Sequence, residues 1–320
     1  MNRLDEEAPS LPLIGSIQNS VGMGFAGNQA TFAIANALGA RLIHAQSMFA
    51  SAHGGFSGRS SSIADPQQFR RDVAFVIAQR PGIIQIGYLP KRDHVSIVAT
   101  QLQDYKGVVL LDPVIGDYKK GMYVSSETAL AIREKLLPMA QIVTPNRFEA
   151  EVLLGSGDRT MTEHAYLNGL FDLGPQAVIV TSFERDPEKH RIKLLFTNGY
   201  SYYRIWGPLF PAYPAHGAGD VFAAAVATFA GLGGSPFAAT LLSTALAARS
   251  VANTTPYGGA SVDPVAALAK WSPIGYQVED DRAIRFCQRS NVEAIPIKPS
   301  AEDGPRLKFA PPKHTITPAD

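Results

Sequence analysis

A glycine-rich motif that precedes a helical pattern is the most specific chemical signal in this sequence. It reads Gly217-Ala218-Gly219-Asp220, and the apolar stretch Val221–Ala230 follows. Glycines let backbone N–H groups turn toward one point, and a helix N-terminus is positive, so the motif predicts an anion hole for a phosphoryl group in transfer. Asp220 could accept a proton from an attacking alcohol. The competing interpretation is a glycine turn whose aspartate only caps its helix.

Polar side chains that directly follow predicted strands form a second signal. In open α/β sheets, ligands bind at the carboxyl ends of the strands. A solvated loop explains any one of these residues alone, whereas several acids that each follow a strand favour a site for Mg²⁺, its waters and the ATP phosphates. The residues are Asp112, Asp117, Thr144, Asn146 and Glu149, together with the hydroxyls of Thr181 and Ser182 as donors to nucleotide phosphate.

The segment Gly22–Gly27 matches the dinucleotide-binding fingerprint literally, but its context differs. About six residues separate it from the predicted strand end at Ser16, and the first acid after Gly27 is Asp65. A nicotinamide site needs a strand directly before the glycines and an acid roughly 20 positions later. The sequence therefore predicts a loop that lies close to a small substrate.

Short apolar runs alternate with longer helical patterns along the chain. This alternation is typical of βαβ units and of a parallel sheet covered on both faces. Strands are predicted at Leu11–Ser16, Arg41–Ala45, Ile83–Gly87, Val108–Leu111, Ile142–Thr144 and Ala177–Val180, with a hairpin at Lys193–Phe196 and Tyr200–Ile205. Helices are predicted at Asn28–Leu38, Pro66–Arg80, His94–Tyr105, Glu127–Leu136, Arg147–Leu154 and Glu163–Phe171, and Ala-rich helices follow within Val221–Ala252 and at Pro264–Lys270.

A change of composition after about Tyr276 predicts two parts. Residues 1–275 would form the main domain, and residues 276–320, with six prolines from Pro296 to Pro318, would form an extension packed on the domain or partly disordered. Cys287 is the one cysteine, which excludes a disulfide framework and a cysteine-based metal site.

The composition indicates a globular enzyme and excludes several partner classes. Of the 320 residues, 46% are hydrophobic and 18% are charged, and the formal net charge is +1. So small a charge argues against a nucleic-acid partner. No apolar run is long enough to cross a membrane. The acids Asp5, Glu6 and Glu7 have the wrong charge for a signal or transit peptide. We therefore expect a cytoplasmic protein.

From Leu11 to about Lys270, the chain resembles the pyridoxal kinases of the ribokinase-like superfamily. Four motifs in the same order carry the resemblance, and together they are more specific than any one alone. They are Gly15–Asn19 with Gly24 and Ala26–Asn28, Asp112–Asp117 with Gly121–Val124, Ile142–Glu151, and Gly217–Asp220.

The resemblance implies a three-layer α/β/α fold and transfer of the ATP γ-phosphate to the 5′-hydroxyl of pyridoxal, pyridoxine or pyridoxamine. It implies that Asp220 is the base and that Gly217–Gly219 form the anion hole. By position, the metal region contains Asp112, Thr144 and Glu149; in this family it holds Mg²⁺ and often a monovalent cation such as K⁺. The residues that fall near ATP are Asp117, Asn146, Thr181 and Ser182. Those that fall near the substrate are Ser16, His53 and Tyr88. Such kinases are often homodimers.

The loop Ala50–Gly55 departs from the family pattern. Relatives commonly carry an aromatic residue and a threonine where this chain has Ala50 and Gly54, so a stacking partner and a hydroxyl are missing. We expect Phe56 to turn in as the replacement, because the preceding glycines free its backbone, and we expect Ala50→Phe to lower the vitamer KM.

This departure leaves the substrate open. A kinase for hydroxymethylpyrimidine or another small ring alcohol is the alternative, because a fold does not determine its substrate. A non-catalytic binding protein of this fold is a second alternative, against which the intact Asp220 and its glycines argue. His216, before the anion hole, is usually apolar in relatives, and a structural role is its simplest interpretation.

Overall fold

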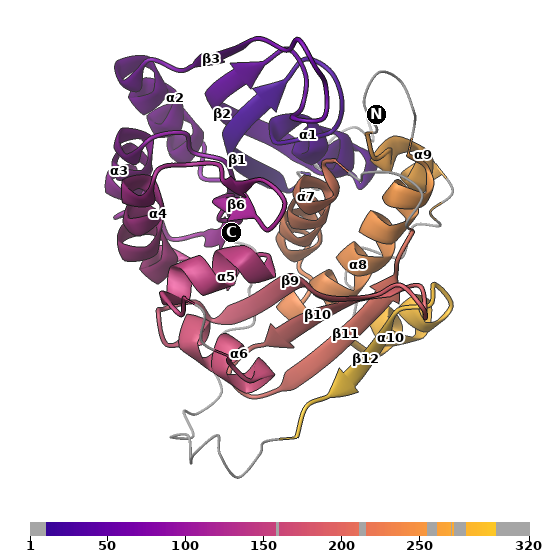
Figure 1. Ribbon diagram of the computed structural model, residues 1–320. Coiled ribbons are helices and arrows are strands. Elements are labelled where there is room, and N and C mark those ends of the chain that lie inside the picture. The colour runs from indigo at the N-terminus through magenta and orange to yellow at the C-terminus, as the bar shows by residue number, and fades with distance from the viewer. Residues whose placement is uncertain are drawn as a thin grey trace, which may run out of the picture.

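A ten-stranded sheet forms the centre of the computed structural model, which describes residues 11–157, 160–210, 216–254, 261–269, 271 and 280–298. The strand order is β12-β11-β10-β9-β8-β5-β4-β1-β2-β3. The pairs from β2 through β9 are parallel, whereas β3 and β10 to β12 join antiparallel. Helices cover the sheet on both sides (Figure 1). The predicted three-layer, mostly parallel α/β/α fold is therefore confirmed.

The strands are β1 (Leu13–Val21), β2 (Arg41–Ala50), β3 (Ser61–Ile63), β4 (Ile83–Ile86), β5 (Val108–Leu111), β6 (Gly116–Asp117), β7 (Gly121–Met122), β8 (Ile142–Val143), β9 (Ala177–Asp186), β10 (Arg191–Thr197), β11 (Tyr202–Pro208) and β12 (Glu293–Pro296). The helices are α1 (Asn28–Ala37), α2 (Pro66–Ala78), α3 (Arg92–Gln101), α4 (Ser126–Ala131), α5 (Arg147–Leu154), α6 (Glu163–Phe171), α7 (Ala218–Gly231), α8 (Pro236–Ala252), α9 (Pro264–Ala269) and α10 (Asp280–Gln288). A π-helical turn, η1 (Ile132–Leu136), and a 3₁₀ turn, η2 (Leu137–Met139), continue α4.

Two separate cores lie on the two faces of the sheet, because successive strand residues point to opposite sides. Ile83 and Leu110 belong to the core under α1, α7, α8 and α10, whereas their neighbours Ile84 and Leu111 belong to the core under α2 to α6. A strand buried on both faces must be apolar throughout, which explains why the central strands were recognisable as short hydrophobic runs.

The predicted ends of several strands are wrong. β1 continues to Val21, five residues past Ser16, because its polar residues pair with β2 on one side. The spacing argument used against a dinucleotide site is therefore wrong, since the strand runs directly into Gly22; the missing acid remains the argument against it. β2 likewise continues to Ala50, and the short edge strand β3 was not predicted.

Residues 280–298, from the proline-rich extension, form elements that the sequence did not predict. α10 packs against α8, and β12 pairs with β11 at the edge of the sheet. The apolar face of α10 is short: Ala283 and Cys287 are buried there. Neighbouring prolines hid this pattern. Residues 276–279 and 299–320 lie outside the described residues.

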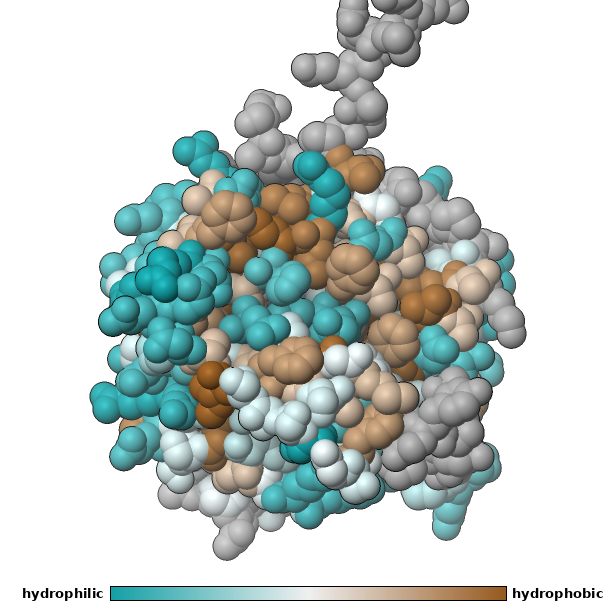
Figure 2. All heavy atoms as spheres, turned by 90° about the horizontal axis from the view of Figure 1, so that it is seen from above, coloured by the Kyte–Doolittle hydropathy of each residue, from teal (hydrophilic) through white to brown (hydrophobic). Residues whose placement is uncertain are grey.

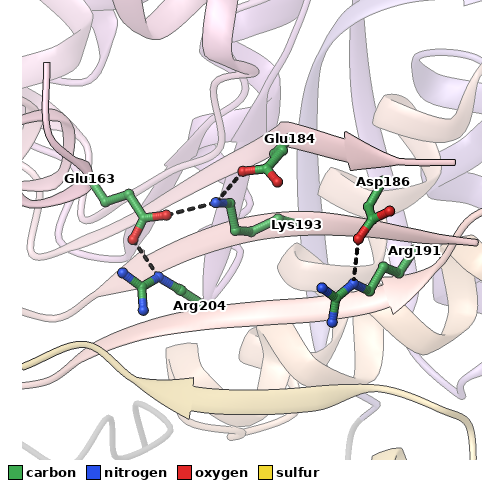
Figure 3. A network of polar contacts seen from close by, with 6 residues as sticks. All are labelled: Glu163, Glu184, Asp186, Arg191, Lys193 and Arg204. Carbon is green, nitrogen blue, oxygen red and sulfur yellow. Dashed lines mark hydrogen bonds and ion pairs between the residues drawn. The ribbon is translucent and has the colours of Figure 1, made fainter. Parts of the chain in front are cut away.

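Ion pairs tie α6 to the antiparallel part of the sheet (Figure 3). The buried Lys193 Nζ lies 2.8 Å from Glu163 Oε1 and also contacts Glu184, and Arg204 Nε lies 2.5 Å from Glu163 Oε2. A buried ammonium group needs such partners, because an unpaired buried charge is strongly destabilising. The network therefore links α6 to β9, β10 and β11.

The surface carries scattered apolar residues. In the face shown in Figure 2, hydrophobic groups are separated by hydrophilic ones. Large exposed apolar side chains occur on different elements, for example Phe32 on α1, Phe75 on α2 and Leu130 on α4. Within the described ranges, no helix is both long and apolar enough to cross a membrane.

Candidate active site

The anion-hole motif lies at the N-terminus of α7, as predicted. Gly217 is the N-cap with φ 90°, and a Cβ there would lie 2.2 Å from the carbonyl oxygen of Phe25. Only glycine fits this turn. Gly219, in the first turn of α7, is exposed. The rest of α7 is buried, which places the positive end of the helix dipole beside an accessible surface.

Asp220, in the first turn of α7, is held by the loop that follows β1. Its Oδ1 accepts a hydrogen bond of 2.7 Å from the Gly27 N–H. Gly27 has φ 55°, and a Cβ there would lie 2.1 Å from the carbonyl oxygen of Asn19, so the loop requires glycine at this position. Burial raises the pKa of Asp220 to about 6, and the Gly27 N–H opposes the increase. The Gly22–Gly27 segment therefore positions the carboxylate of Asp220.

The carboxyl groups of Glu149 and Asp220 lie close enough to Asp112 for their charges to act on it. Asp112 Oδ1 accepts a 2.9 Å hydrogen bond from Thr144 Oγ1. Burial, followed by the charges of Glu149 and Asp220, raises the pKa of Asp112 well above its usual value. Burial also raises the pKa of Glu149 to about 8. Carboxyl groups that repel in a buried place favour a cation, and their oxygens suit Mg²⁺.

The oxygen atoms of Asp112, Thr144 and Glu149 suit a cation that also binds waters and substrate phosphates. In the part of the chain that the structure describes, no three acidic, histidine or cysteine side chains form a metal-binding group by themselves. Mg²⁺ commonly binds through one or two carboxylates, with waters and substrate phosphates as its other ligands. Asp112, Thr144 and Glu149 fit this second arrangement.

Glu149 is held by the backbone around it. Its Oε1 accepts from the N–H groups of Ile115 (3.0 Å) and Gly116 (3.3 Å), and its Oε2 accepts from the Asn146 N–H (2.8 Å). Asn146 Oδ1 in turn accepts from the Glu149 N–H, which completes a capping box at the start of α5. Glu149 therefore joins the β5–β6 loop to α5.

Two residues predicted at the ATP site are engaged within the protein. Asn146 Nδ2 donates to the Gly116 carbonyl at 2.9 Å, and its oxygen caps α5. Asp117 Oδ1 accepts from the N–H groups of Lys119 and Lys120, both at 2.7 Å, and its Oδ2 accepts from the Tyr123 hydroxyl. These side chains shape the loops beside the carboxyl cluster, and their roles at the ATP site stay predictions.

Thr181 and Ser182 do not follow β9, as predicted, but lie inside it. The three residues from Thr181 to Phe183 face the single residue Leu194, so the strand carries a bulge. Ser182 has φ 48°, and Thr181 pairs with Asn146 just past β8. Bulges often redirect side chains next to active sites. The bulge therefore brings both hydroxyl residues to the same edge of the sheet as Thr144.

The predicted substrate residues are only partly accessible. Ser16 is fully buried; its hydroxyl donates to Asn28 Oδ1 (2.7 Å) and accepts from Gln18 Nε2 (2.8 Å). Its contact with the substrate stays a prediction. Tyr88 is half-buried, and its hydroxyl lies 3.5 Å from the Tyr123 carbonyl oxygen. Phe56 packs edge-on against the ring of His53, with 4.8 Å between the ring centroids.

The prediction for Ala50 is wrong. This residue ends β2 and is 1% exposed, packed with Val21, Ala26 and Met48. A phenylalanine there would overpack a tight cluster rather than stack on a substrate. The predicted substrate loop begins after Ala50. Phe56 contacts the ring of His53 there, and its stacking on the substrate stays a prediction.

Gly27, which binds Asp220, and Asn19, which adjoins Gly27, were not among the predicted site residues. Asn19, near the end of β1, is half-buried, and its Oδ1 would lie 2.8 Å from a Cβ at Gly27. The available signal was the polar run Ser16-Ile17-Gln18-Asn19-Ser20 in a central strand, where apolar residues are expected.

The pH dependence of turnover should report on Asp220. A base must be deprotonated, and the pKa of Asp220 is raised from 3.8 to about 6. We therefore expect kcat/KM to fall as the pH drops through about 6. A pH profile from 4.5 to 8.5 measures this, with the folded state monitored by circular dichroism. A profile that stays flat down to pH 4.5 would contradict the assignment.

Known proteins resemble this chain in sequence and in fold. A pyridoxal kinase of Deinococcus radiodurans is 29% identical over 239 residues, which cover 69% of this chain and 80% of that protein. The bovine pyridoxal kinase is 31% identical over 179 residues, or 52% of this chain and 57% of the bovine protein. The pyridoxal kinase of Staphylococcus aureus, solved with ADP, has a TM-score of 0.76 at 22% identity and covers 90% of this chain and 100% of its own; it has also been solved with pyridoxal.

A family model described as phosphomethylpyrimidine kinase matches residues 25–266, from the glycine loop through α9. This range includes the anion hole, Asp220 and the carboxyl cluster. The chain therefore belongs to the ribokinase-like phosphomethylpyrimidine kinase family and is an ATP-dependent phosphotransferase.

Proposed function

We propose that the chain phosphorylates the 5′-hydroxymethyl group of a B6 vitamer with ATP. One observation carries the proposal: Asp220, fixed by Gly27, adjoins the amides that precede α7 at the edge where β1, β2, β5 and β8 end. Relatives named pyridoxal kinase match at 29% and 31% identity, which supports the vitamer as the acceptor.

The chemistry follows from the position of Asp220. Its carboxylate accepts the proton of the acceptor hydroxyl while the hydroxyl oxygen forms a bond to the γ-phosphorus of ATP. The bond between that phosphorus and the bridging oxygen breaks, and ADP leaves with the electron pair. The amides of Gly217 to Gly219 stabilise the negative charge on the transferred group, because the helix dipole already points there.

Asp112, Thr144 and Glu149 would hold Mg²⁺ together with the ATP phosphates. Bound there, the ion supplies charge neutralisation of the ATP phosphates. Thr181 and Ser182, on the bulge of β9, would donate hydroxyl hydrogen bonds to nucleotide phosphate. The proposed acceptor end lies at the loops after β1 and β2, where His53 and Phe56 pack together.

The family model names a second acceptor class, since it describes kinases of phosphomethylpyrimidine. Steady-state kinetics separate the two. With saturating MgATP, we expect kcat/KM for pyridoxal, pyridoxine or pyridoxamine to exceed that for hydroxymethylpyrimidine by at least about tenfold, because a site that pairs its buried polar groups with one ring rejects another. A preference for the pyrimidine would reassign the acceptor, and no turnover with any alcohol would favour a binding protein.

A further inference from the structure

Six polar side chains are buried where the first turn of α1 meets the sheet, and they form what we call the polar network. Each is at most 3% exposed; they are Ser16, Gln18 and Ser20 on β1, Gln85 on β4, and Asn28 and Thr31 on α1. Those on the strands point to the same side of the sheet as Ile14 and Ile83, into the core under α1 and α7. Burial of polar groups gives no stability by itself, so their presence in this core needs a separate reason.

The hydrogen bonds of the polar network run in one direction. Gln18 Nε2 donates to Ser16 Oγ at 2.8 Å and to Thr31 Oγ1 at 3.0 Å. Ser16 Oγ donates in turn to Asn28 Oδ1 at 2.7 Å, and Thr31 Oγ1 donates to Gln85 Oε1 at 2.9 Å. Because each hydroxyl accepts one bond and donates another, removal of either leaves buried partners unpaired. The polar network thus ties the first turn of α1 to β1 and β4.

Asn28, the first residue of α1, is fixed from both neighbouring strands. Its Nδ2 lies within hydrogen-bond distance of the Gln18 carbonyl oxygen (3.2 Å) and Ser20 Oγ (3.0 Å) on β1, and of the Ala45 carbonyl oxygen (3.3 Å) on β2. The start of α1 therefore cannot shift along the sheet without breaking these bonds.

The anchored start of α1 reaches Asp220 through Gly27. Gly27 is the N-cap of α1 and carries no side chain to cap the helix; its N–H donates to Asp220 Oδ1 at 2.7 Å, and its carbonyl oxygen lies 3.4 Å from Thr31 Oγ1. Since α1 and α7 pack against each other (Figure 1), the carboxylate lies between the N-termini of two helices, and both positive ends stabilise its ionised form. Of these two helices, the polar network fixes α1.

We propose that the polar network positions the base: Asn28 and Thr31 hold the Gly27 N–H against Asp220 and so set the direction in which the carboxylate meets the acceptor hydroxyl. The inference rests on the proposed function and adds positioning residues to it. Asn28 is 1% exposed and Thr31 is fully buried, so both act through Gly27 and not by contact with a substrate. A displacement of about 1 Å at a reacting group can cost roughly 10²-fold in rate, even when its cause lies far from the chemistry.

Thr31→Val tests this inference, because it removes the hydroxyl and nearly keeps the volume of the side chain. We expect kcat for pyridoxal at saturating MgATP to fall about 10- to 100-fold and the Kd for ADP to change less than about threefold. Thr31→Ser keeps the hydroxyl and should hold kcat within about threefold of wild type. The control Tyr105→Phe removes a hydroxyl that bonds the Pro81 carbonyl oxygen at the amino end of β4, and should lower the thermal midpoint but not kcat.

Two further measurements separate positioning from general damage. In the Asp220→Asn background there is no base to position, so Thr31→Val should lower the residual kcat by less than about threefold. Hydrogen exchange measured by NMR reads the Gly27 N–H without any substrate. Relative to the amide of Val226, in the buried middle of α7, the Gly27 amide should exchange at least about tenfold faster in Thr31→Val and at an unchanged ratio in Tyr105→Phe.

Each outcome decides the inference. A kcat in Thr31→Val within threefold of wild type, an equal loss in Thr31→Ser, an unchanged exchange ratio, or losses that multiply with Asp220→Asn would each overturn it. If Thr31→Val does not fold, Gln85→Met removes the acceptor of the same hydroxyl from β4 and should change kcat and the exchange ratio in the same directions. Wild-type turnover in Asp220→Asn, or no turnover of any ring alcohol by the wild-type protein, would overturn the proposed function, and the exchange ratio would still decide whether the polar network holds Gly27.

Discussion

Asp220→Asn should lower kcat by about 10²- to 10⁴-fold, the usual contribution of a positioned base. The amide keeps the shape of the carboxylate and can still accept the Gly27 N–H, so the Kd for MgATP should change less than about threefold. Initial rates from a coupled ADP assay and calorimetry with ATP measure the two effects. Turnover near the wild-type value in a folded variant would show that Asp220 is not the base.

Two controls show whether Asp220→Asn lowers kcat by removing the base or by disturbing the fold or the start of α7. Because the folded-state pKa of Asp220 is raised, its ionised form destabilises the folded state above about pH 6, and asparagine removes this penalty. The thermal midpoint at pH 8 should therefore not fall. Asp65→Asn is the matched control: Asp65 caps α2 through Gln67 and Gln68, and α2 and α7 pack on opposite faces of the sheet. A helix-cap role alone would predict similar, small effects on kcat for both variants.

Glu149→Ala should lower the free energy of unfolding by about 2–5 kcal/mol, because the N–H groups of Ile115, Gly116 and Asn146 lose their acceptor. Urea denaturation measures this change. In the fraction that folds, the Mg²⁺ concentration for half-maximal rate should rise more than the acceptor KM, since Glu149 lies in the carboxyl cluster and not at the acceptor end.

The control for this prediction is Glu127→Ala. Glu127 also lies in the first turn of a helix, α4, but is exposed, so its loss should cost only about 0.3–1 kcal/mol through the helix dipole. Equal losses in the two variants would mean that the three N–H groups find other acceptors. If only the acceptor KM rises and the Mg²⁺ requirement does not change, Glu149 lies at the acceptor end of the site and not at the metal.

The framework and the position of the site were predictable from the sequence. Central strands buried on both faces must be apolar runs, and parallel strands end at the same edge, so Asp112 and Thr144 could be expected together before any coordinates. The glycine-rich motif at the start of α7 was equally informative, because the backbone angle φ of 90° at Gly217 requires glycine.

Contacts between distant segments were not predictable. Gly27 and Asp220 are 193 positions apart, and nothing in the sequence near either residue indicates that the Gly27 N–H donates to the Asp220 carboxylate. Ser16 matched a family motif, but its hydroxyl is bonded to Gln18 on the same strand and to Asn28 on α1. The assignment of Ala50 to the substrate loop failed because strand ends depend on pairing partners, and β3 extends β2 through Ala50.

The most direct test of the proposed function is to follow the γ-phosphate itself. With [γ-³²P]ATP, Mg²⁺ and pyridoxal, the wild-type protein should transfer label to the 5′-oxygen of pyridoxal, with one ADP formed for each labelled vitamer. Asp220→Asn should lose this transfer in parallel with kcat. Label that appears only as inorganic phosphate, or label on hydroxymethylpyrimidine but not on pyridoxal, would contradict the proposal.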